Sequence, residues 1–171
     1  MIPNLSRVGV LRQAGIPAAT DSPLQELRSA APVLKLKLEE IETEAGPSGL
    51  QSAFRTAKQK QVGAIMIGGG RTFFTERRQI VEFAGKYRLA AIYAQKAFVD
   101  EGGLMSYGHD STALHRAAAH YVDKILKGVK PADLPVQQAT KFEFIINLKA
   151  AKQIGLTIPV NVLERANQVI R

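Results

Sequence analysis

The sequence has no cysteine and no tryptophan among its 171 residues. Without cysteine the chain forms no disulfide, no cysteine-ligated zinc site and no iron–sulfur cluster, and it has no thiol nucleophile. It also lacks any apolar run that approaches the roughly 20 residues of a transmembrane helix. Residues 1–7 have neither the basic nor the apolar segment of a signal peptide. The absence of cysteine is compatible with cytoplasm and periplasm alike, so it does not place the chain in a compartment.

Acidic residues are fewer than basic ones: the chain has 15 Asp and Glu and 23 Lys and Arg, which gives a formal net charge of +8. The basic residues are scattered, without a long Lys/Arg run or interleaved aromatic side chains. Nucleic-acid binding needs a concentrated basic patch, so the charge is better explained by solvated helix faces. With 46% hydrophobic residues, the composition is that of one globular domain with a real core.

The first half of the chain alternates between short apolar runs and segments with one apolar helical face. Such alternation predicts an α/β fold, with a parallel sheet covered by helices on both faces. Ligands of these sheets bind beyond the carboxyl ends of the strands, so the candidate ligand loops are 12–20, 42–47, 68–72 and 94–97. The expected strands are 8–11, 34–38, 62–67 and 89–93, and the apolar helix faces lie within 22–34, 48–57 and 71–87.

The second half departs from this alternation. A helix over 110–127 has a wide apolar stripe at three- and four-residue spacing and ends at Gly128, as helices with a glycine C-cap do. Asn147 is expected to cap the helix that follows the last strand. The remaining expected elements are a short helix at 96–101, strands at 104–108 and 142–146, a loop at 130–135, and helices at 148–154 and 160–170.

Gly68, Gly69 and Gly70 follow an expected strand and precede a helix. This placement is typical of anion-binding loops, but the chain has neither GxxxxGK[ST] nor GxGxxG, so nucleotide binding is not favoured. A ligand-facing loop or a tight turn is the better interpretation. The glutamates of 39–44 are interpreted as a strand end and a solvated loop.

The histidines, His109, His115 and His120, do not have metal-ligand spacing, so no metal site is expected. Ser106 and Asp110 lie close to His109, but no serine has the G-x-S-x-G turn of a hydrolase. Because no arrangement that catalysis requires is visible, we expect a protein that is not an enzyme and needs no cofactor.

Several spaced segments carry a resemblance to a known family. They read EGGLMSYG at 101–108, AHYVDKILKG at 119–128, KPADLPV at 130–136, TKFEFIINLK at 140–149 and GLTIP at 155–159. In these segments the chain resembles the substrate-binding proteins of ABC transporters, whose better-known members are tied to tryptophan and other aromatic amino acids. The resemblance covers nearly the whole chain.

The resemblance implies two flavodoxin-like lobes, as in type I periplasmic binding proteins, with the ligand clamped between them. Residues 1–107 would form the second lobe, a doubly wound parallel sheet. Residues 108–171 would be C-terminal crossover helices and a strand that pack on the first lobe and return. Residues 1–8 align with the middle of a family member, so we expect a truncated chain or a fragment that lacks the first lobe.

The resemblance also implies a solute-binding component of an ABC importer, located in the periplasm, with a membrane permease as partner. Its ligand would be an amino acid or another small carboxylate. Because the crossover helix would have no first lobe to cover it, we expect a homo-oligomer through that helix. Nucleic acid is not expected as a partner.

The candidate ligand-binding residues come from the ends of the predicted strands. In the first ligand loop the chain departs from the Asn-Pro-like stretch of the family, and we hypothesise that an arginine there pairs with a ligand carboxylate. The candidates are Arg12, Gln13, Gly69, Gly70, Arg71, Gln95 and Ser106.

Two alternatives remain. The effector-binding domain of a bacterial transcription regulator has the same two-lobe architecture, but it would accompany a helix-turn-helix segment, and none is readable here. A flavodoxin-like enzyme or nucleotide binder would need phosphate-loop or acidic-pocket residues, which the sequence does not show.

Overall fold

The computed structural model describes residues 2, 5–17 and 21–171, and within them the chain forms one seven-stranded sheet in the order β2-β1-β3-β4-β5-β6-β7. The strands from β2 to β5 are parallel to one another, β6 runs antiparallel to β5, and β7 is parallel to β6. The expected α/β fold is therefore confirmed. The strands are β1 (Arg7–Gln13), β2 (Lys37–Thr43), β3 (Ala64–Ile67), β4 (Ala90–Tyr93), β5 (Met105–His109), β6 (Phe142–Asn147) and β7 (Gln168–Ile170).

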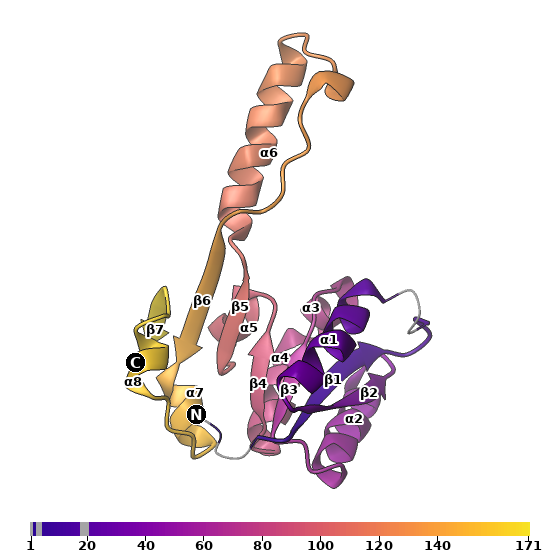
Figure 1. Cartoon of the computed structure of the whole chain (residues 1–171), viewed down its shortest axis with the longest axis vertical. Coiled ribbons are helices and arrows are strands. Elements are labelled where there is room, and N and C mark those ends of the chain that lie inside the picture. The colour runs from indigo at the N-terminus through magenta and orange to yellow at the C-terminus, as the bar shows by residue number, and fades with distance from the viewer. Residues whose placement is uncertain (1, 3–4, 18–20) are drawn as a thin grey trace.

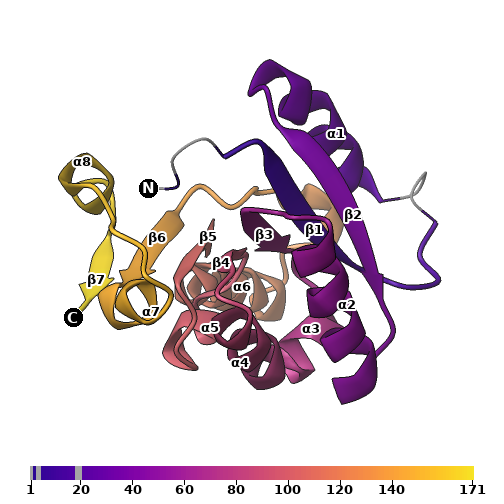
Figure 2. The same ribbon diagram turned by 90° about the horizontal axis from the view of Figure 1, so that it is seen from below.

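Helices cover the two faces of this sheet unequally. Figure 2 shows α1 on one side of the sheet and α2, α4 and α5 on the other. The helices are α1 (Ser22–Val33), α2 (Pro47–Gln59), α3 (Arg71–Thr75), α4 (Arg77–Lys86), α5 (Lys96–Asp100), α6 (Ser111–Leu126), α7 (Leu148–Gln153) and α8 (Val160–Leu163), with a 3-10 turn, η2, at Pro131–Asp133.

The larger core lies under α2, α4 and α5. Phe54 and Ile80 from these helices are fully buried, and they belong to the same cluster as Ile65 of β3. Tyr93 of β4 stacks on Phe98 of α5, with ring centroids 4.8 Å apart. A second cluster forms around β5, β6 and α7 and includes Met105, Ile146 and Ala151. The two clusters hold together the strands whose carboxyl ends form the candidate site.

The strand expected at 34–38 begins later and runs farther. The backbone of Lys35 has φ 54°, and the chain turns there before β2 starts at Lys37. Of the glutamates interpreted as a strand end and a solvated loop, Glu39, Glu40 and Glu42 lie inside this edge strand, and the exposed Glu44 follows it. The strand runs farther than expected, and carboxylates within it are paired with basic side chains, as Glu39 is with Lys37 and Lys60.

Two further expected elements also change. The segment 71–87 is two helices, because the chain leaves helical geometry at Glu76 between α3 and α4. The helix expected over 160–170 ends at Leu163, and residues 168–170 pair with β6 instead. The side chain of Asn167 accepts a hydrogen bond from the Phe144 amide, 2.7 Å away, which fixes that pairing.

An arm leaves the lobe between β5 and β6. In Figure 1, α6 extends away from the sheet, and the chain returns beside it through η2 to β6. None of the residues of α6 is buried. Part of the predicted apolar stripe of this helix is open to solvent, with Val122 54% and Leu126 82% exposed.

Candidate ligand-binding site

A cavity of about 990 Å³ opens over the sheet face that carries α1. Its floor is apolar and comes from Val10 of β1, Met66 of β3 and Ile92 of β4. Leu24 and Leu27 of α1 form one wall. A parallel sheet is normally covered on both faces, and here this central part of one face is left open. The cavity therefore has a flat hydrophobic floor.

Loops after the strands form the upper end of the cavity, at the carboxyl edge of the sheet. Gln13 ends β1 and Ile16 follows it, Gly68–Gly70 follow β3, and Ala94 follows β4. Three of the four predicted ligand loops thus contribute, although residues 18–20 of the first lie outside the described residues. The loop 42–47 does not line the cavity.

The predicted site residues divide into two groups. Arg12, Gln13, Gly69 and Gly70 line the cavity. The other three, Arg71, Gln95 and Ser106, do not.

Each residue of the second group has a different environment. Arg71 is exposed at the start of α3, one residue beyond Gly70. Gln95 follows Ala94, and its side-chain oxygen is buried without a hydrogen-bond partner in the described part of the chain. Ser106 is 2% exposed within β5. Each of these three residues is a neighbour in sequence of a lining residue, Gly70, Ala94 or Tyr107, without lining the cavity itself.

The Gly68–Gly70 loop presents backbone to the cavity. Gly70 has φ 139°, which a residue with a side chain rarely adopts, so glycine is needed there. A Cβ atom added at Gly68 or Gly69 would meet nothing within 4 Å, so these two positions border open space. Backbone amides in such a loop are available to a polar group of a ligand.

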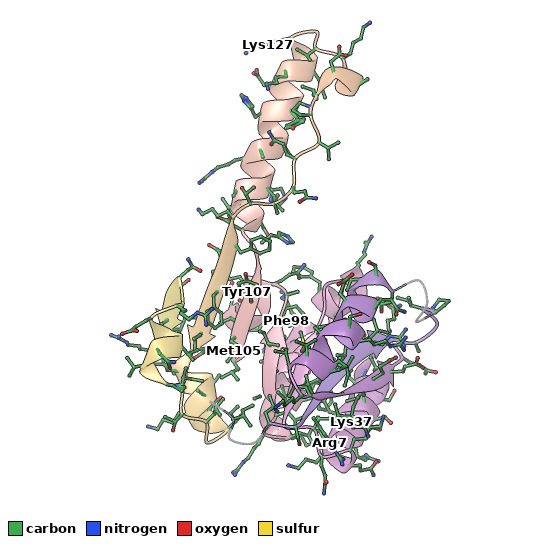
Figure 3. All side chains as sticks on the ribbon, in the orientation of Figure 1. Arg7, Lys37, Phe98, Met105, Tyr107 and Lys127 are labelled. Carbon is green, nitrogen blue, oxygen red and sulfur yellow. The ribbon has the colours of Figure 1, made fainter. Side chains whose placement is uncertain are left out.

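Sequence reasoning missed Tyr107, which stands at the rim of the cavity and is 56% exposed. Figure 3 shows it on β5, at the end of the lobe where the arm begins. Its ring stacks on Phe142 at 5.8 Å and meets Phe144 edge-on at 6.2 Å between centroids. The alternation within β5 could have revealed it, because Tyr107 and the buried Ser106 must face opposite sides of the sheet.

Arg12 lines the cavity but is held by the protein itself. The residue is only 5% exposed. Its guanidinium donates to the carbonyl of Ile16 at 2.7 Å, and it pairs with Glu42 at 3.0 Å and with Glu40 at 3.3 Å. Its Nε atom lies 3.5 Å from a carboxylate oxygen of Asp21. All three guanidinium nitrogens therefore have acceptors within the chain, so a ligand carboxylate would compete with carboxylates already in place.

The site has the character of a binding pocket. Tyr93 borders the cavity, but it is 1% exposed and its ring stacks on Phe98 in the core, and burial raises the pKa of its phenol, so it stays neutral. Within residues 2, 5–17 and 21–171, no group of three acidic or histidine side chains is placed to hold a metal ion. Among the same residues, no helix is long and apolar enough to cross a membrane.

The sheet order, the crossover arm and a cavity at the carboxyl edge together define one lobe of a periplasmic binding protein. The model of the ABC transporter substrate binding protein family matches residues 1–170, and the chain belongs to this family.

Solved structures agree with this assignment. A conserved domain protein from Vibrio cholerae is 29% identical over 98% of this chain, with a TM-score of 0.86. The ABC domain from Streptococcus pneumoniae in complex with L-Trp is 28% identical over 98%, with a TM-score of 0.84. A ligand-free, open substrate binding protein with adhesive properties from Clostridium difficile shares the fold at 17% identity over 99%, with a TM-score of 0.71. This chain spans 56% of each of those three chains. No curated protein is significantly similar to it.

Proposed function

We propose that this chain binds a small solute at the carboxyl edge of its sheet and serves as the solute-binding component of an ABC importer. The observation that carries the proposal is the cavity itself. It joins an apolar floor to backbone groups of the Gly68–Gly70 loop and to the ring of Tyr107 at the rim. Ligand pockets combine a mostly apolar lining with a few polar groups in this way.

The ligand class that fits best is an amino acid with an apolar or aromatic side chain. Tyr107 supplies exposed aromatic surface at the cavity, and the buried rings of Phe73 and Tyr93 border it. The L-Trp complex of the similar domain from Streptococcus pneumoniae supports this class. In our proposal the polar part of the ligand meets Gln13 and the backbone of Gly69 and Gly70. Arg71 and Gln95 flank that contact, and Ser106 supports the strand that carries Tyr107.

The setting of this activity is also part of the proposal. A membrane permease would receive the solute, and the periplasm would be the compartment, as the family suggests. The lobe described by residues 1–107 would hold one side of the solute, and residues 108–171 would form the crossover segment. Because pockets usually enclose 70–90% of a small ligand, a single lobe should bind more weakly than a closed clamp.

The test is isothermal titration of the purified chain with L-tryptophan, then with other aromatic and branched amino acids and with small carboxylates. We expect saturable binding of an aromatic amino acid. Tyr107→Ala should weaken that binding roughly fivefold or more, because stacked rings contribute about 1 kcal/mol. Val136→Ala is the control, since Val136 is 98% exposed on the arm. No binding across the panel would contradict the proposal for this chain.

We further propose that the chain forms a homo-oligomer through α6. The helix is fully helical from Ser111 to Leu126 but buries none of its residues, and Val122, Ile125 and Leu126 are exposed on it. An apolar helix face of this kind is typically covered by protein. A second copy of the chain is the partner that is always available at the same concentration.

A further inference from the structure

We propose that Arg12 is a positioning residue, which ties the loop after β1 to strand β2 and so fixes one wall of the cavity. An effect of this wall on solute affinity rests on the proposed function. The effect of Arg12 on the position of the loop is independent of that function.

The contacts of Arg12 add side-chain links between segments that the backbone joins through the β1–β2 ladder and the hydrogen bond from Ala14 to Thr43. Its own strand, β1, lies beside β2, whose side chains Glu40 and Glu42 accept from its Nη1 atom at 3.3 and 3.0 Å. Its Nη2 atom donates to the carbonyl of Ile16 at 2.7 Å. One side chain therefore fastens the loop to the edge strand.

The same guanidinium also reaches the start of α1. Its Nε atom donates to Oδ2 of Asp21 at 3.5 Å, and Oδ1 of Asp21 accepts from the Leu24 amide at 3.2 Å. Asp21 is thus the N-cap of α1 and a partner of Arg12 at once. Since Leu24 and Leu27 line the cavity, a displacement of Asp21 would move the helical wall with it.

Only an arginine can make this set of contacts. The planar guanidinium has five donors directed along its edges, whereas a lysine ammonium is a single point charge. The four acceptors come from four different residues around one plane. Burying a positive charge is costly unless it is paired, and the three surrounding carboxylates provide that pairing at a residue that is 5% exposed.

The geometry also separates this role from direct ligand binding. Arg12 sits at the edge of the cavity with each of its nitrogens directed to the chain. Gln13, the next residue, lines the same cavity and pairs with Thr43 of β2 in the sheet ladder. Arg12 therefore acts on a bound solute through the position of Gln13, Ile16 and α1.

The test is amide hydrogen exchange measured by NMR on the whole chain and on the variants Arg12→Gln and Arg12→Lys. Three amides report the tie directly. The Ala14 amide donates to Thr43, the Leu24 amide to the Asp21 side chain, and the Gln25 amide to the Asp21 carbonyl. In Arg12→Gln we expect these amides to exchange about tenfold faster, with amides of β3 and β4 unchanged. In Arg12→Lys the exchange rates of these amides should lie between those of the wild type and those of Arg12→Gln.

Arg28→Gln is the matched control. Arg28 lies on α1, is 42% exposed and pairs with the same Glu40 at 2.5 Å, but it does not line the cavity. We expect no selective change at the three amides in this variant. If Arg12→Gln leaves these amides unchanged, or if exchange rises equally throughout the chain, the positioning role is wrong.

Titration with L-tryptophan then separates this proposal from the proposed function. If the wild-type chain binds, Arg12→Gln should raise Kd by severalfold together with the local exchange. A rise in Kd without any change at the three amides would show direct ligand contact and overturn the proposal. If the wild-type chain does not bind L-tryptophan, the exchange result still decides whether Arg12 positions the loop.

Discussion

Gly108 lies where β5 passes close to the end of β4. A Cβ atom at this position would overlap the carbonyl oxygen of Ala94, which is backbone and cannot move aside easily. We predict that Gly108→Ala destabilises the fold by about 2 kcal/mol, as overpacking in a tight site does. Urea unfolding followed by circular dichroism measures this directly.

Gly85→Ala serves as the control for that substitution. Gly85 is in α4, and a Cβ atom there meets nothing within 4 Å. Alanine should therefore stabilise the helix by roughly 0.5–1 kcal/mol. A Gly108→Ala variant as stable as the wild type would show that β5 and Ala94 are less closely packed than described.

Asp110, at the base of the arm, makes a contribution to the stability of the fold that depends on pH. Its carboxylate accepts a hydrogen bond from the Ala113 amide and pairs with Lys141 at 3.0 Å, and these contacts, in that order, lower the pKa of Asp110. A carboxyl with a lowered pKa in the folded state stabilises the fold above its unfolded pKa. That contribution is lost as pH falls through the folded value.

We therefore predict that Asp110→Asn lowers Tm at pH 7 and that the gap to wild type narrows as the pH is lowered toward 3. Asparagine keeps the capping oxygen but not the charge that pairs with Lys141. Thermal scans across this range make the comparison, with Asp133→Asn on the exposed η2 turn as control. A gap that does not change with pH would argue against this role.

Single residues also show where sequence reasoning reaches its limit. The first helix was expected within 22–34, and Asp21, just before that range, is its N-cap, because a pattern locates a helix start only to within a residue or two. The role of Arg12 depends on Glu40 and Glu42, nearly thirty residues away in the chain. No spacing rule connects them until β1 and β2 are known to be adjacent.

The short helix α7 depends on its cap. Asn147 is 6% exposed and accepts hydrogen bonds from the amides of Lys149 and Ala150, at 3.0 and 3.2 Å. We predict that Asn147→Ala destabilises the chain by about 1 kcal/mol, whereas Asn147→Asp retains most of the stability. Chemical unfolding of the two variants would separate capping from packing, since a loss of equal size in both would contradict the capping role.

Elements with a strong period of their own were predictable. The strands β1, β3 and β4 are visible in the sequence as the apolar runs 8–11, 62–67 and 89–93. The role of Asn147 as a helix cap is also predictable from the sequence alone. The predicted bounds are wrong where contacts with another element determine where a strand lies. β2 is displaced toward its glutamates because basic partners pair with them, and β7 forms because β6 offers an open edge.

At the scale of the whole molecule, the alternation of elements predicted the sheet and the edge at which the cavity lies. Residue alternation within β5 separates Tyr107 from the buried Ser106, but it could not predict that Tyr107 meets the rings of Phe142 and Phe144 from β6. It also could not show that part of one sheet face stays uncovered. The contact among the three rings comes from the second half of the chain, where the regular alternation ends, whereas the uncovered face lies over β1, β3 and β4.

The exposed apolar face of α6 predicts association between copies of the chain. Leu126 is 82% exposed on a helix without buried residues, so burial against a second copy would remove apolar surface from water. We expect the wild-type chain to sediment as a dimer or larger species at micromolar concentrations, and Leu126→Glu to weaken association at least about tenfold, because a buried unpaired carboxylate is strongly unfavourable. Val160→Glu is the control, since Val160 is 70% exposed on α8, away from the arm. Analytical ultracentrifugation distinguishes the outcomes. A wild-type chain that remains monomeric, or a Val160→Glu variant that dissociates as readily as Leu126→Glu, would mean that α6 does not form the contact between copies.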